Sequence, residues 1–301
     1  MDCVAPFQSP LPYGFVTRIL QCLPWPDRIR LEGVNREFRN FLRNSPVPCT
    51  ATETHINVMV KLSHEVESIM LIRDKSYITV KENNSAIICN LLSRLFLQVP
   101  ANSFSFYWLK VDYQMLTALT DYTDSIEKLH FSRIIFSGCK LDSIFWRNFW
   151  IRMPRLREVE LFYLNGQTPN DILNELVKVR KLEVIKILKC ATLVNDAVLI
   201  ELSANCEKLR EFWLHQSGQQ VTFAGVRKLT EALLPALPNG EQRRIDIWDS
   251  SVDIMHFWAA FAHKLRPMVR VRGSPNQEFN PQIHDSSEIR SFVNDQLKIT
   301  F

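Results

Sequence analysis

The sequence has little glycine and no long apolar segment. Only 8 of its 301 residues are glycine, whereas 46% are hydrophobic and 23% are charged. This balance is typical of a packed globular protein and excludes collagen-like and low-complexity chains. No window approaches about 18 uninterrupted apolar residues, so we expect no membrane-spanning helix. Residues 1–6 lack the basic start and apolar run of a signal peptide, so we expect an intracellular protein in the cytoplasm, the nucleus or both.

The cysteines are odd in number and scattered. None of the 7 belongs to a CxxC pair, which is the spacing that builds many small zinc modules. A disulfide scaffold is equally unexpected, because such scaffolds belong to short chains with many cysteines. We interpret these residues as reduced thiols, some of them packed in the core. The sequence predicts no metal site and no cofactor.

The short motifs of common enzymes are also missing. The chain contains no GxxxxGK[ST], GxGxxG, HExxH or GxSxG pattern. His256 and His263 fall on one apolar helical segment, which favours packing or surface positions over metal ligation. The net charge is only +4, whereas nucleic-acid-binding domains usually concentrate many cations on one face. We therefore expect a protein without catalytic residues, and nucleic-acid binding is a minor alternative.

Prolines mark out a small unit at the N-terminus. Of the 15 prolines, 7 fall within the first 48 residues, and Pro26-Asp27 is a favourable helix start. Apolar residues at helical spacing are Phe15, Ile19 and Leu23 in a first segment, and Val34, Phe38, Phe41 and Leu42 in a third. We expect three short helices in residues 1–48, with their core at 10–45. Units below about 40 residues usually need a metal, a disulfide or a partner, so this unit predicts a partner.

The rest of the chain, residues 49–301, contains a repeated pattern that is clearest at 126–250. Three segments read as a basic residue followed by L-x-x-[apolar]-x-[apolar], and they begin at Arg155, Lys181 and Lys208. Weaker copies are Ile126-x-x-Leu129-x-Phe131 and Ile245-x-Ile247, while Phe104-x-Phe106 and Val269-x-Val271 extend the series at its ends. The final apolar positions, 131, 161, 187, 214 and 247, are 30, 26, 27 and 33 residues apart. We interpret each pattern as a strand.

Helical segments separate these strands. The predicted helices are Asn170–Val179, Asp196–Asn205, Thr222–Leu234 and Val252–Lys264. A strand and a helix in each period of about 20–30 residues is typical of stacked repeats, and it predicts an α/β fold. Residues 50–100 are a divergent start, with a strand at 56–62 and a helix at 88–95. Residues 273–301 either cap the repeats or contain a helix, Ser286–Leu297, that folds over the sheet.

Residues 10–45 resemble the F-box motif. The matching positions are Leu11, Pro12, Phe15, Val16, Ile19, Leu20, Leu23, Asp27, Ile29, Val34, Arg36 and Phe38. Two positions depart from the common pattern, because Gly14 stands where an acidic residue is frequent and Asn35 where a cysteine often precedes the arginine. Neither departure removes an apolar contact position.

The repeats resemble the cysteine-containing class of leucine-rich repeat, which is commonly joined to an F-box. The best copy reads Leu182-x-x-Ile185-x-Ile187-x-x-Cys190, followed by Asn195-Asp196-Ala197, a helix, and Cys206-Glu207-Lys208-Leu209. At the position of Cys190 the other copies have Ile134, Leu164, Ser217 and Ser250. In this class a row of polar side chains, the polar ladder, forms hydrogen bonds with the backbone of the turns, and here that ladder is incomplete. The resemblance implies an irregular solenoid, with a parallel sheet and helices on its convex side.

The F-box resemblance implies a partner and a function. F-box helices dock on a Skp-family adaptor, which sits on a cullin, while the C-terminal domain holds a protein target for ubiquitin transfer. Such a receptor is not catalytic, because it acts by raising effective concentration. The residues that the resemblance assigns to the adaptor contact are Leu11, Pro12, Phe15, Ile19, Leu23, Ile29, Val34 and Phe38. The alternatives are an ordinary helical cap on the repeats, a repeat scaffold that acts outside a ubiquitin ligase, and a nucleic-acid binder.

The target surface is expected on the concave sheet. One column of outward residues contains His130, Glu160, Lys186, Trp213 and Asp246, and the next contains Ser132, Phe162, Leu188, His215 and Trp248. Because aromatic side chains anchor interfaces, the predicted target-binding residues are Phe162, Lys186, Trp213, His215 and Trp248. The alternative is burial of these tryptophans under the C-terminal tail. A basic run, Lys178, Arg180, Lys181, Lys186 and Lys189, is either a solvated edge or a contact for an acidic or phosphorylated target.

Overall fold

The structure is a computed structural model of the whole chain. It describes residues 15, 18–19, 22–23, 25–34, 36, 55–63, 66–73, 76–80, 103–108, 110–111, 132–141, 146–151, 153, 155–164, 170–190, 194–216, 220–235, 237, 240–248, 252–269, 277–278 and 289–301. The chain forms two compact units. The first contains residues 1–105 and 114–131, and the second contains residues 106–113 and 132–301.

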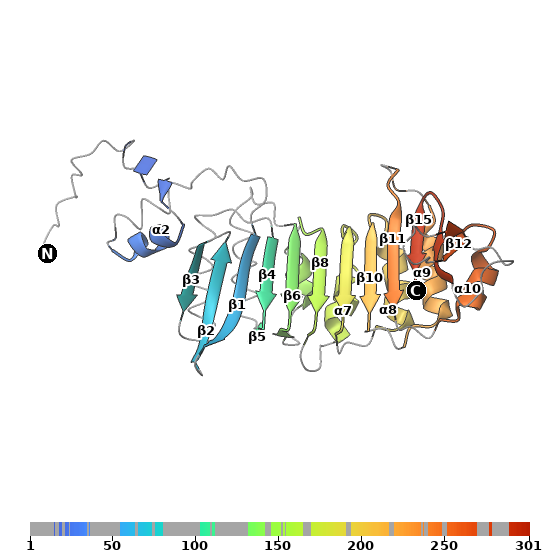
Figure 1. Cartoon of the computed structure of the whole chain (residues 1–301), viewed down its shortest axis with the longest axis horizontal. Helices are drawn as coiled ribbons and strands as arrows, with labels where there is room; N and C mark the ends of the chain where they lie inside the picture. The colour runs from blue at the N-terminus through green and yellow to red at the C-terminus, as the bar shows by residue number, and fades with distance from the viewer. Residues whose placement is uncertain are drawn as a thin grey trace, which may run out of the picture. The chain divides into compact units, whose positions relative to one another are not determined.

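The first unit contains a short helix and an antiparallel group of strands (Figure 1). Helix α2 spans Trp25–Glu32, where Pro26 and Asp27 predict a helix start, and Arg30 forms an ion pair with Asp27 at 2.9 Å. Strands β1 (His55–Ser63), β2 (Val66–Arg73) and β3 (Ser76–Val80) pair in chain order. Strand β1 contains the predicted strand at 56–62, whereas the helix predicted at 88–95 lies outside the described residues.

The second unit is an α/β structure with a mostly parallel sheet, as the repeated pattern predicts. Its strands are the end of β4 (Ser103–Tyr107), β5 (Lys110–Val111), β6 (Arg133–Ser137), β7 (Lys140–Leu141), β8 (Glu158–Phe162), β9 (Val184–Leu188), β10 (Glu211–His215), β11 (Arg243–Trp248), β12 (Arg266–Val269), β13 (Gln277–Glu278), β14 (Ile289–Val293) and β15 (Leu297–Thr300). Strands β6, β8, β9, β10, β11 and β15 are parallel neighbours in this order. The antiparallel strands β14, β12 and β13 follow, and β5 pairs with β7 separately.

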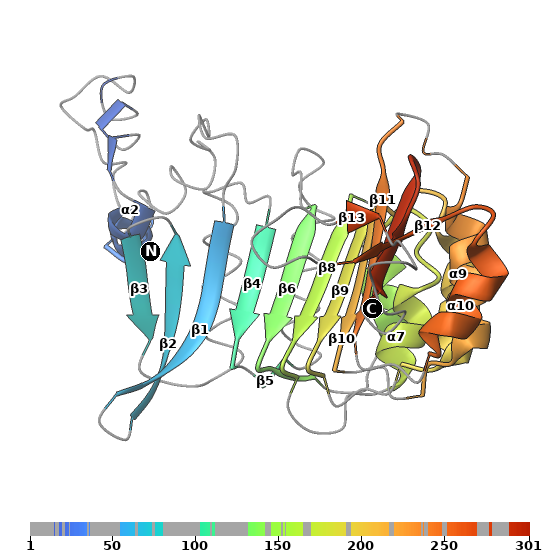
Figure 2. The ribbon, with the colours of Figure 1, turned by 45° about the vertical axis from the view of Figure 1, so that its right-hand side comes forward.

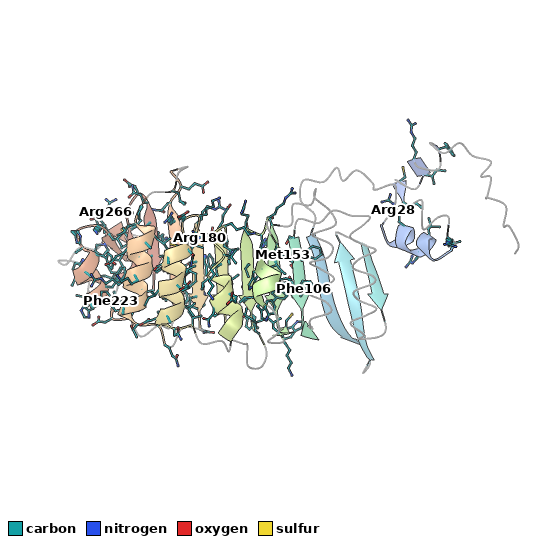
Figure 3. The ribbon with its side chains drawn as sticks, turned by 180° about the vertical axis from the view of Figure 1, so that it is seen from behind. Arg28, Phe106, Met153, Arg180, Phe223 and Arg266 are labelled. Carbon is teal, nitrogen blue, oxygen red and sulfur yellow. The ribbon has the colours of Figure 1, made fainter. Side chains whose placement is uncertain are left out.

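Helices lie on one face of this sheet (Figures 2 and 3). They are α6 (Trp146–Ile151), α7 (Asn170–Leu176), α8 (Asp196–Asn205), α9 (Phe223–Leu233) and α10 (Ile254–Phe261). Burial alternates along β10, where Phe212 and Leu214 are buried, and the helices bury residues such as Leu199 and Leu229. Each side chain of this size contributes about 1.5–3 kcal/mol when it leaves water. The apolar strand positions therefore form one core with the helices.

Helices α7 to α10 begin at the residues that the sequence predicts or within two residues of them. Asn195 caps α8, because its Oδ1 accepts a hydrogen bond from the Val198 N–H at 3.1 Å. Thr222 caps α9 through the Ala224 N–H at 3.2 Å, and Asp253 caps α10. Caps of this kind stabilise a helix by about 1 kcal/mol each. They satisfy donors that the first turn of a helix leaves unpaired.

The register expected for the first repeat is wrong by five residues. Strand β6 places Ile135 opposite Glu160 and Ser137 opposite Phe162, so His130 and Ser132 are not members of the two predicted columns. The physical reason is that apolar residues at 126, 129, 131, 134 and 136 satisfy the same pattern in two registers. A signal for the correct register was present, because Cys139 follows Phe136 at the offset at which Cys190 follows Ile187.

The C-terminal residues differ from two expectations. Residues 289–293 and 297–300 form strands β14 and β15, so the predicted helix Ser286–Leu297 is wrong over its described part. Ile289, Phe292 and Val293 fit a helical spacing, but pairing with β12 and β15 gives the backbone the hydrogen bonds of a sheet. Strand β12 is antiparallel, and β15 instead continues the parallel series next to β11.

A left-handed residue follows strands β4, β6, β8, β9 and β10. These residues, with positive φ angles of 60°, 65°, 49°, 51° and 51°, are Trp108, Gly138, Tyr163, Lys189 and Gln216, and we call them the turn row. The N–H of one member donates to a carbonyl at the end of the neighbouring strand, as in Tyr163 to Leu188 at 3.0 Å. The turn row therefore continues the hydrogen bonding of the parallel sheet beyond the ends of its strands.

Two buried thiols stabilise these turns. The Cys190 thiol donates to the Leu161 carbonyl at 3.3 Å, and the Cys139 thiol donates to the Phe106 carbonyl at the same distance. Burial raises the pKa of the Cys190 thiol to about 11, so it stays protonated as a donor at neutral pH. Because Cys139, not Ile134, occupies the position of Cys190 in the first repeat, this polar ladder has one more member than the sequence pattern indicated.

Candidate protein-binding face

The face of the sheet turned away from the helices, which we call the far face, carries the predicted columns. From β8 to β11, Glu160, Lys186, Trp213 and Asp246 are in register, as are Phe162, Leu188, His215 and Trp248. The register of both columns is therefore confirmed over these four strands, but the exposure expected for Glu160 and Asp246 is wrong. Glu160 and Asp246 are buried, and most of the other members are half-buried. The sheet thus brings all five predicted target-binding residues onto one face.

Three rings form a continuous stack on the far face. The ring centroids of Trp213 and His215 are 5.7 Å apart with an interplanar angle of 22°, and those of His215 and Trp248 are 4.9 Å apart with an angle of 25°. Trp213 and His215 alternate along β10, while Trp248 is the in-register neighbour of His215 on β11. Trp248 keeps 50% of its surface exposed. The stack therefore ends in an aromatic ring that remains accessible.

Two cations lie over Trp213. The Lys186 ammonium is 5.1 Å from the ring centroid, and the Arg244 guanidinium is 4.6 Å from it. Arg244 also forms an ion pair with Asp246 at 2.8 Å. Cation–π contacts of this kind contribute about 0.5–1 kcal/mol at exposed sites. We call Lys186, Trp213, His215, Arg244 and Trp248 the face cluster. Arg244 was missed from the sequence, although strand alternation with Asp246 and Trp248 places it on the same face.

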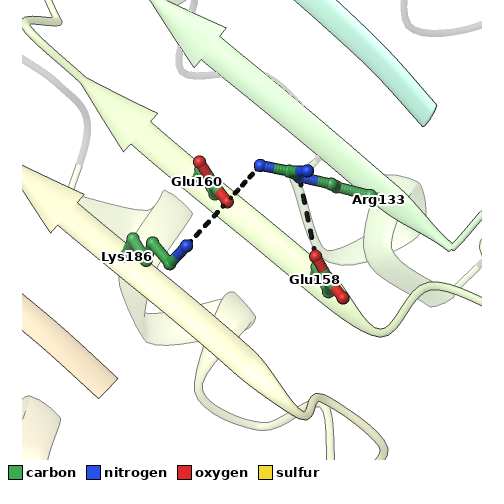
Figure 4. Close-up of polar contacts among 4 residues, drawn as sticks. All are labelled: Arg133, Glu158, Glu160 and Lys186. Carbon is green, nitrogen blue, oxygen red and sulfur yellow. Dashed lines mark hydrogen bonds and ion pairs between the residues drawn. The ribbon is translucent and has the colours of Figure 1, made fainter. Parts of the chain in front are cut away.

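A buried carboxylate connects the face cluster to the neighbouring strands (Figure 4). Glu160 receives the Arg133 guanidinium at 2.7 Å and the Lys186 ammonium at 3.2 Å on the same oxygen, Oε1. Arg133 also lies 3.5 Å from Glu158. A buried carboxylate is tolerated only when it is paired and hydrogen-bonded. Lys186 is therefore held between Glu160 and Trp213, which fixes the face cluster in one arrangement.

The predicted basic run does not form one patch. The Lys178 ammonium pairs with Glu175 at 2.8 Å, the Arg180 Nε donates to Asn205, and Lys181 donates to the Met153 carbonyl at 2.6 Å. Burial, together with repulsion from Arg157, lowers the pKa of Lys181 to about 8. Lys186 lies on the far face, whereas Lys189 belongs to the turn row. The five residues are separated because only Lys186 lies in a strand, whereas Lys178, Arg180 and Lys181 lie between α7 and β9.

The residues predicted to contact an adaptor are described only in part. Phe15, Ile19 and Val34 are exposed by 52%, 44% and 66% of their surface, and Leu23 is half-buried. Phe15 and Ile19 are helical, and Val34 follows α2 in a turn. Ile29 lies within α2. The remaining predicted contacts, Leu11, Pro12 and Phe38, lie outside the described residues.

The histidine and acidic side chains of the described residues do not gather into a metal-binding cluster. Over the ranges that the structure describes, no group of three or more His, Cys, Asp or Glu side chains could hold a metal ion. His256 stacks on Phe223 with a centroid distance of 4.9 Å, and His263 is exposed. No helix among the described residues is long and apolar enough to cross a membrane.

No protein-family model matches the sequence, and no curated protein matches it either.

Proposed function

We propose that the protein is a non-catalytic F-box substrate receptor, which docks on a Skp-family adaptor through residues 10–45 and holds a protein target on leucine-rich-repeat-like units. The adaptor would connect it to a cullin, so that the target lies close to a ubiquitin-charged enzyme. The receptor would then speed ubiquitin transfer by raising the effective concentration of the target near that enzyme, which requires no nucleophile in this chain.

The exposure of Phe15, Ile19 and Val34 is the observation that carries this proposal. A helical cap would bury such side chains against its own chain, whereas a docking unit presents them to a partner. Each large apolar side chain left in water forgoes about 1.5–3 kcal/mol of burial energy. An adaptor that covers these residues recovers that energy on binding.

The far face supports the second half of the proposal. The face cluster combines two tryptophans, a histidine and two cations, and interfaces are enriched in tryptophan, tyrosine and arginine at the positions that dominate binding energy. Its side chains are held by ion pairs and stacking before any target arrives. A preorganised surface loses less conformational entropy on binding.

Co-purification with a Skp-family adaptor tests the proposal. We expect an equimolar complex with the parent chain and little or none with the triple variant Phe15→Ala, Ile19→Ala and Val34→Ala. A matched control replaces Ile200 and Met255 by alanine, because these residues are also large, apolar and exposed, at 46% and 43%, but lie on α8 and α10. The control is expected to bind like the parent.

Two results would contradict the receptor function. If the folded parent chain does not bind the adaptor, the far face belongs to a repeat scaffold that acts outside a ubiquitin ligase. If both variants lose binding equally, the contact depends on general surface hydrophobicity and not on the N-terminal helices. Thermal unfolding of all three proteins verifies that the substitutions leave the fold intact.

A further inference from the structure

The turn row exposes a second set of aromatic side chains at the carboxyl ends of the parallel strands. Trp108 and Tyr163 keep 57% and 50% of their surface exposed, although both are large. Lys189 and Gln216 are exposed as well. A left-handed backbone is unfavourable for these residue types, and each costs about 1–3 kcal/mol unless the surroundings hold it. The repeat therefore places large side chains where glycine would be easier to accommodate.

Gly138 is the exception, and its lack of a side chain makes room for Trp108. A Cβ atom at Gly138 would overlap the Trp108 indole, so the ring lies directly against the glycine backbone. Gly138 is also the member between Trp108 and Tyr163 in the turn row. The Lys189 ammonium lies 5.3 Å from the centroid of the Tyr163 ring. The row thus presents an indole after β4, a phenol after β8 and an ammonium group after β9, with Gly138 between the first two.

The charged side chains among the described residues of these turns are positive. Lys140 is exposed two residues after Gly138, and Lys189 follows β9. Within the described turn residues 108, 138–141, 163–164, 189–190 and 216, no side chain is acidic. The opposite ends of the strands differ, because Arg157, Glu183, Arg210 and Glu241 pair there in an alternating ladder with distances of 3.5, 3.4 and 3.3 Å. Cations are neutralised within the protein at one end and presented to solvent at the other.

This chemistry fits an acidic polypeptide better than a nucleic acid. A nucleic acid requires many cations along its phosphates, whereas these turns contribute two described lysines. An extended peptide needs only one or two carboxylates near the lysines and a flat or aromatic residue that stacks on Trp108 and Tyr163.

We propose that the turn row is a docking site for an acidic, extended segment of the target protein, with aromatic residues against Trp108 and Tyr163 and a carboxylate against Lys189. This inference rests on the proposed receptor function, since the segment belongs to the target that the receptor holds. The half-buried residues Phe162 and Leu188 lie directly before the turn row and continue its apolar surface toward the far face.

Binding of a fluorescein-labelled random copolymer of glutamate and tyrosine, followed by anisotropy with the full chain, tests this site. We expect binding to this copolymer and none to a copolymer of lysine and tyrosine. Lys189→Glu is expected to weaken binding by about tenfold, because it replaces attraction by repulsion. Lys178→Glu is the matched control, since it makes the same charge change at an exposed lysine of the neighbouring helix end and is expected to bind like the parent.

The aromatic contribution is tested in the same assay. Trp108→Ala is expected to weaken binding by about thirtyfold, the effect of truncating a central aromatic anchor, and Trp108→Phe is expected to recover much of it. Ile200→Ala removes an exposed apolar side chain on α8 and is expected to have no effect. Unfolding transitions of the variants identify any that lose the fold, and Trp108→Phe keeps the test decisive if the alanine variant does.

Four results would overturn the site. These are no binding by the parent, equal loss in Lys178→Glu and Lys189→Glu, no change in Trp108→Ala, or tighter binding of a single-stranded oligouridylate than of the acidic copolymer. Adaptor binding measured on the same samples separates this inference from the proposed function. Adaptor binding without copolymer binding rejects the turn-row site alone, whereas copolymer binding without adaptor binding rejects the receptor function alone.

Discussion

The two faces of the parallel sheet use their side chains in different ways. On the helix side, residues such as Phe212 and Leu229 are almost completely buried and contact other apolar groups. On the far face, Lys186, Trp213 and Trp248 combine charge and aromatic surface, and they retain contact with solvent. The apolar burial of this unit is therefore concentrated on the helix side, whereas the far face holds paired charges and aromatic rings that solvent reaches.

Truncation of a helix-side residue is expected to have the largest effect. Phe212→Ala removes a ring that is 1% exposed in the centre of β10. Phenylalanine-to-alanine changes in cores cost about 3–5 kcal/mol, because they lose burial and leave a cavity. Chemical denaturation measures the loss. A cost below about 1 kcal/mol would mean that the face is not the core of this unit.

A glycine between two helices is expected to have the next largest effect. Gly225 in α9 lies against Asp196, and an added Cβ would stand 2.5 Å from the Asp196 Oδ1 and 3.0 Å from its Cα. Gly225→Ala therefore destabilises the fold by about 1–3 kcal/mol through overpacking, although alanine normally favours a helix. In an Asp196→Ala background the cost is expected to fall. Stabilisation by Gly225→Ala in the parent would contradict the close contact.

Lys181 is expected to make stability depend on pH. Its pKa falls from 10.5 to about 8 on folding, mainly because the ammonium is partly buried and also because Arg157 is near. The folded chain thus binds this proton less tightly than the unfolded chain does. The protonated ammonium therefore destabilises the fold fully below pH 8, and this destabilisation disappears as the pH rises from 8 toward 10.5. Because solvent partly screens the half-buried ammonium, we expect this lowered pKa to reduce the free energy of unfolding by about 1 kcal/mol below pH 8.

The variant Lys181→Met isolates this contribution. Denaturation of parent and variant at several pH values is expected to show a gain in parent stability, relative to the variant, across the alkaline window. The hydrogen bond from Lys181 to the Met153 carbonyl is lost in the variant at every pH and produces a constant offset. Parallel pH profiles would show that Lys181 titrates normally in the folded chain.

A far-face substitution is expected to have the smallest effect on stability. Trp248→Ala removes a half-exposed ring whose stacking contact is with His215 at 4.9 Å. The free energy of unfolding is expected to fall by less than about 1 kcal/mol. Thermal unfolding next to Phe212→Ala makes the comparison direct. A loss as large as that of Phe212→Ala would erase the distinction between the two faces.

Local sequence signals predicted the elements of the second unit, but long-range pairing decided its details. Helical spacing located α8 and α9, and strand alternation placed Trp213 and Trp248 on one face. The β6 register failed because two overlapping apolar patterns were equally good within the segment. Strand β14 was mistaken for a helix because its hydrogen bonds come from β12 and β15, which local spacing does not reveal.

The turn row shows a different limit of sequence reading. Positive φ angles are easily anticipated at glycine, as at Gly138. Trp108, Tyr163, Lys189 and Gln216 share no side-chain property, so only their equivalent positions in the repeat unite them. Once the β6 register is corrected, the position two residues after the last buried strand residue identifies all five members. The shared position of these residues can therefore be recognised in the sequence only when the pairing of the strands is known.

Hydrogen–deuterium exchange of the chain, alone and with a Skp-family adaptor, tests the central claim most directly. We expect adaptor binding to slow exchange in residues 15–34 and to leave β8 to β11 unchanged, because the proposed target surface is the far face. Protection confined to the strands, or no protection at residues 15–34 in a chain that still binds the adaptor, would contradict it.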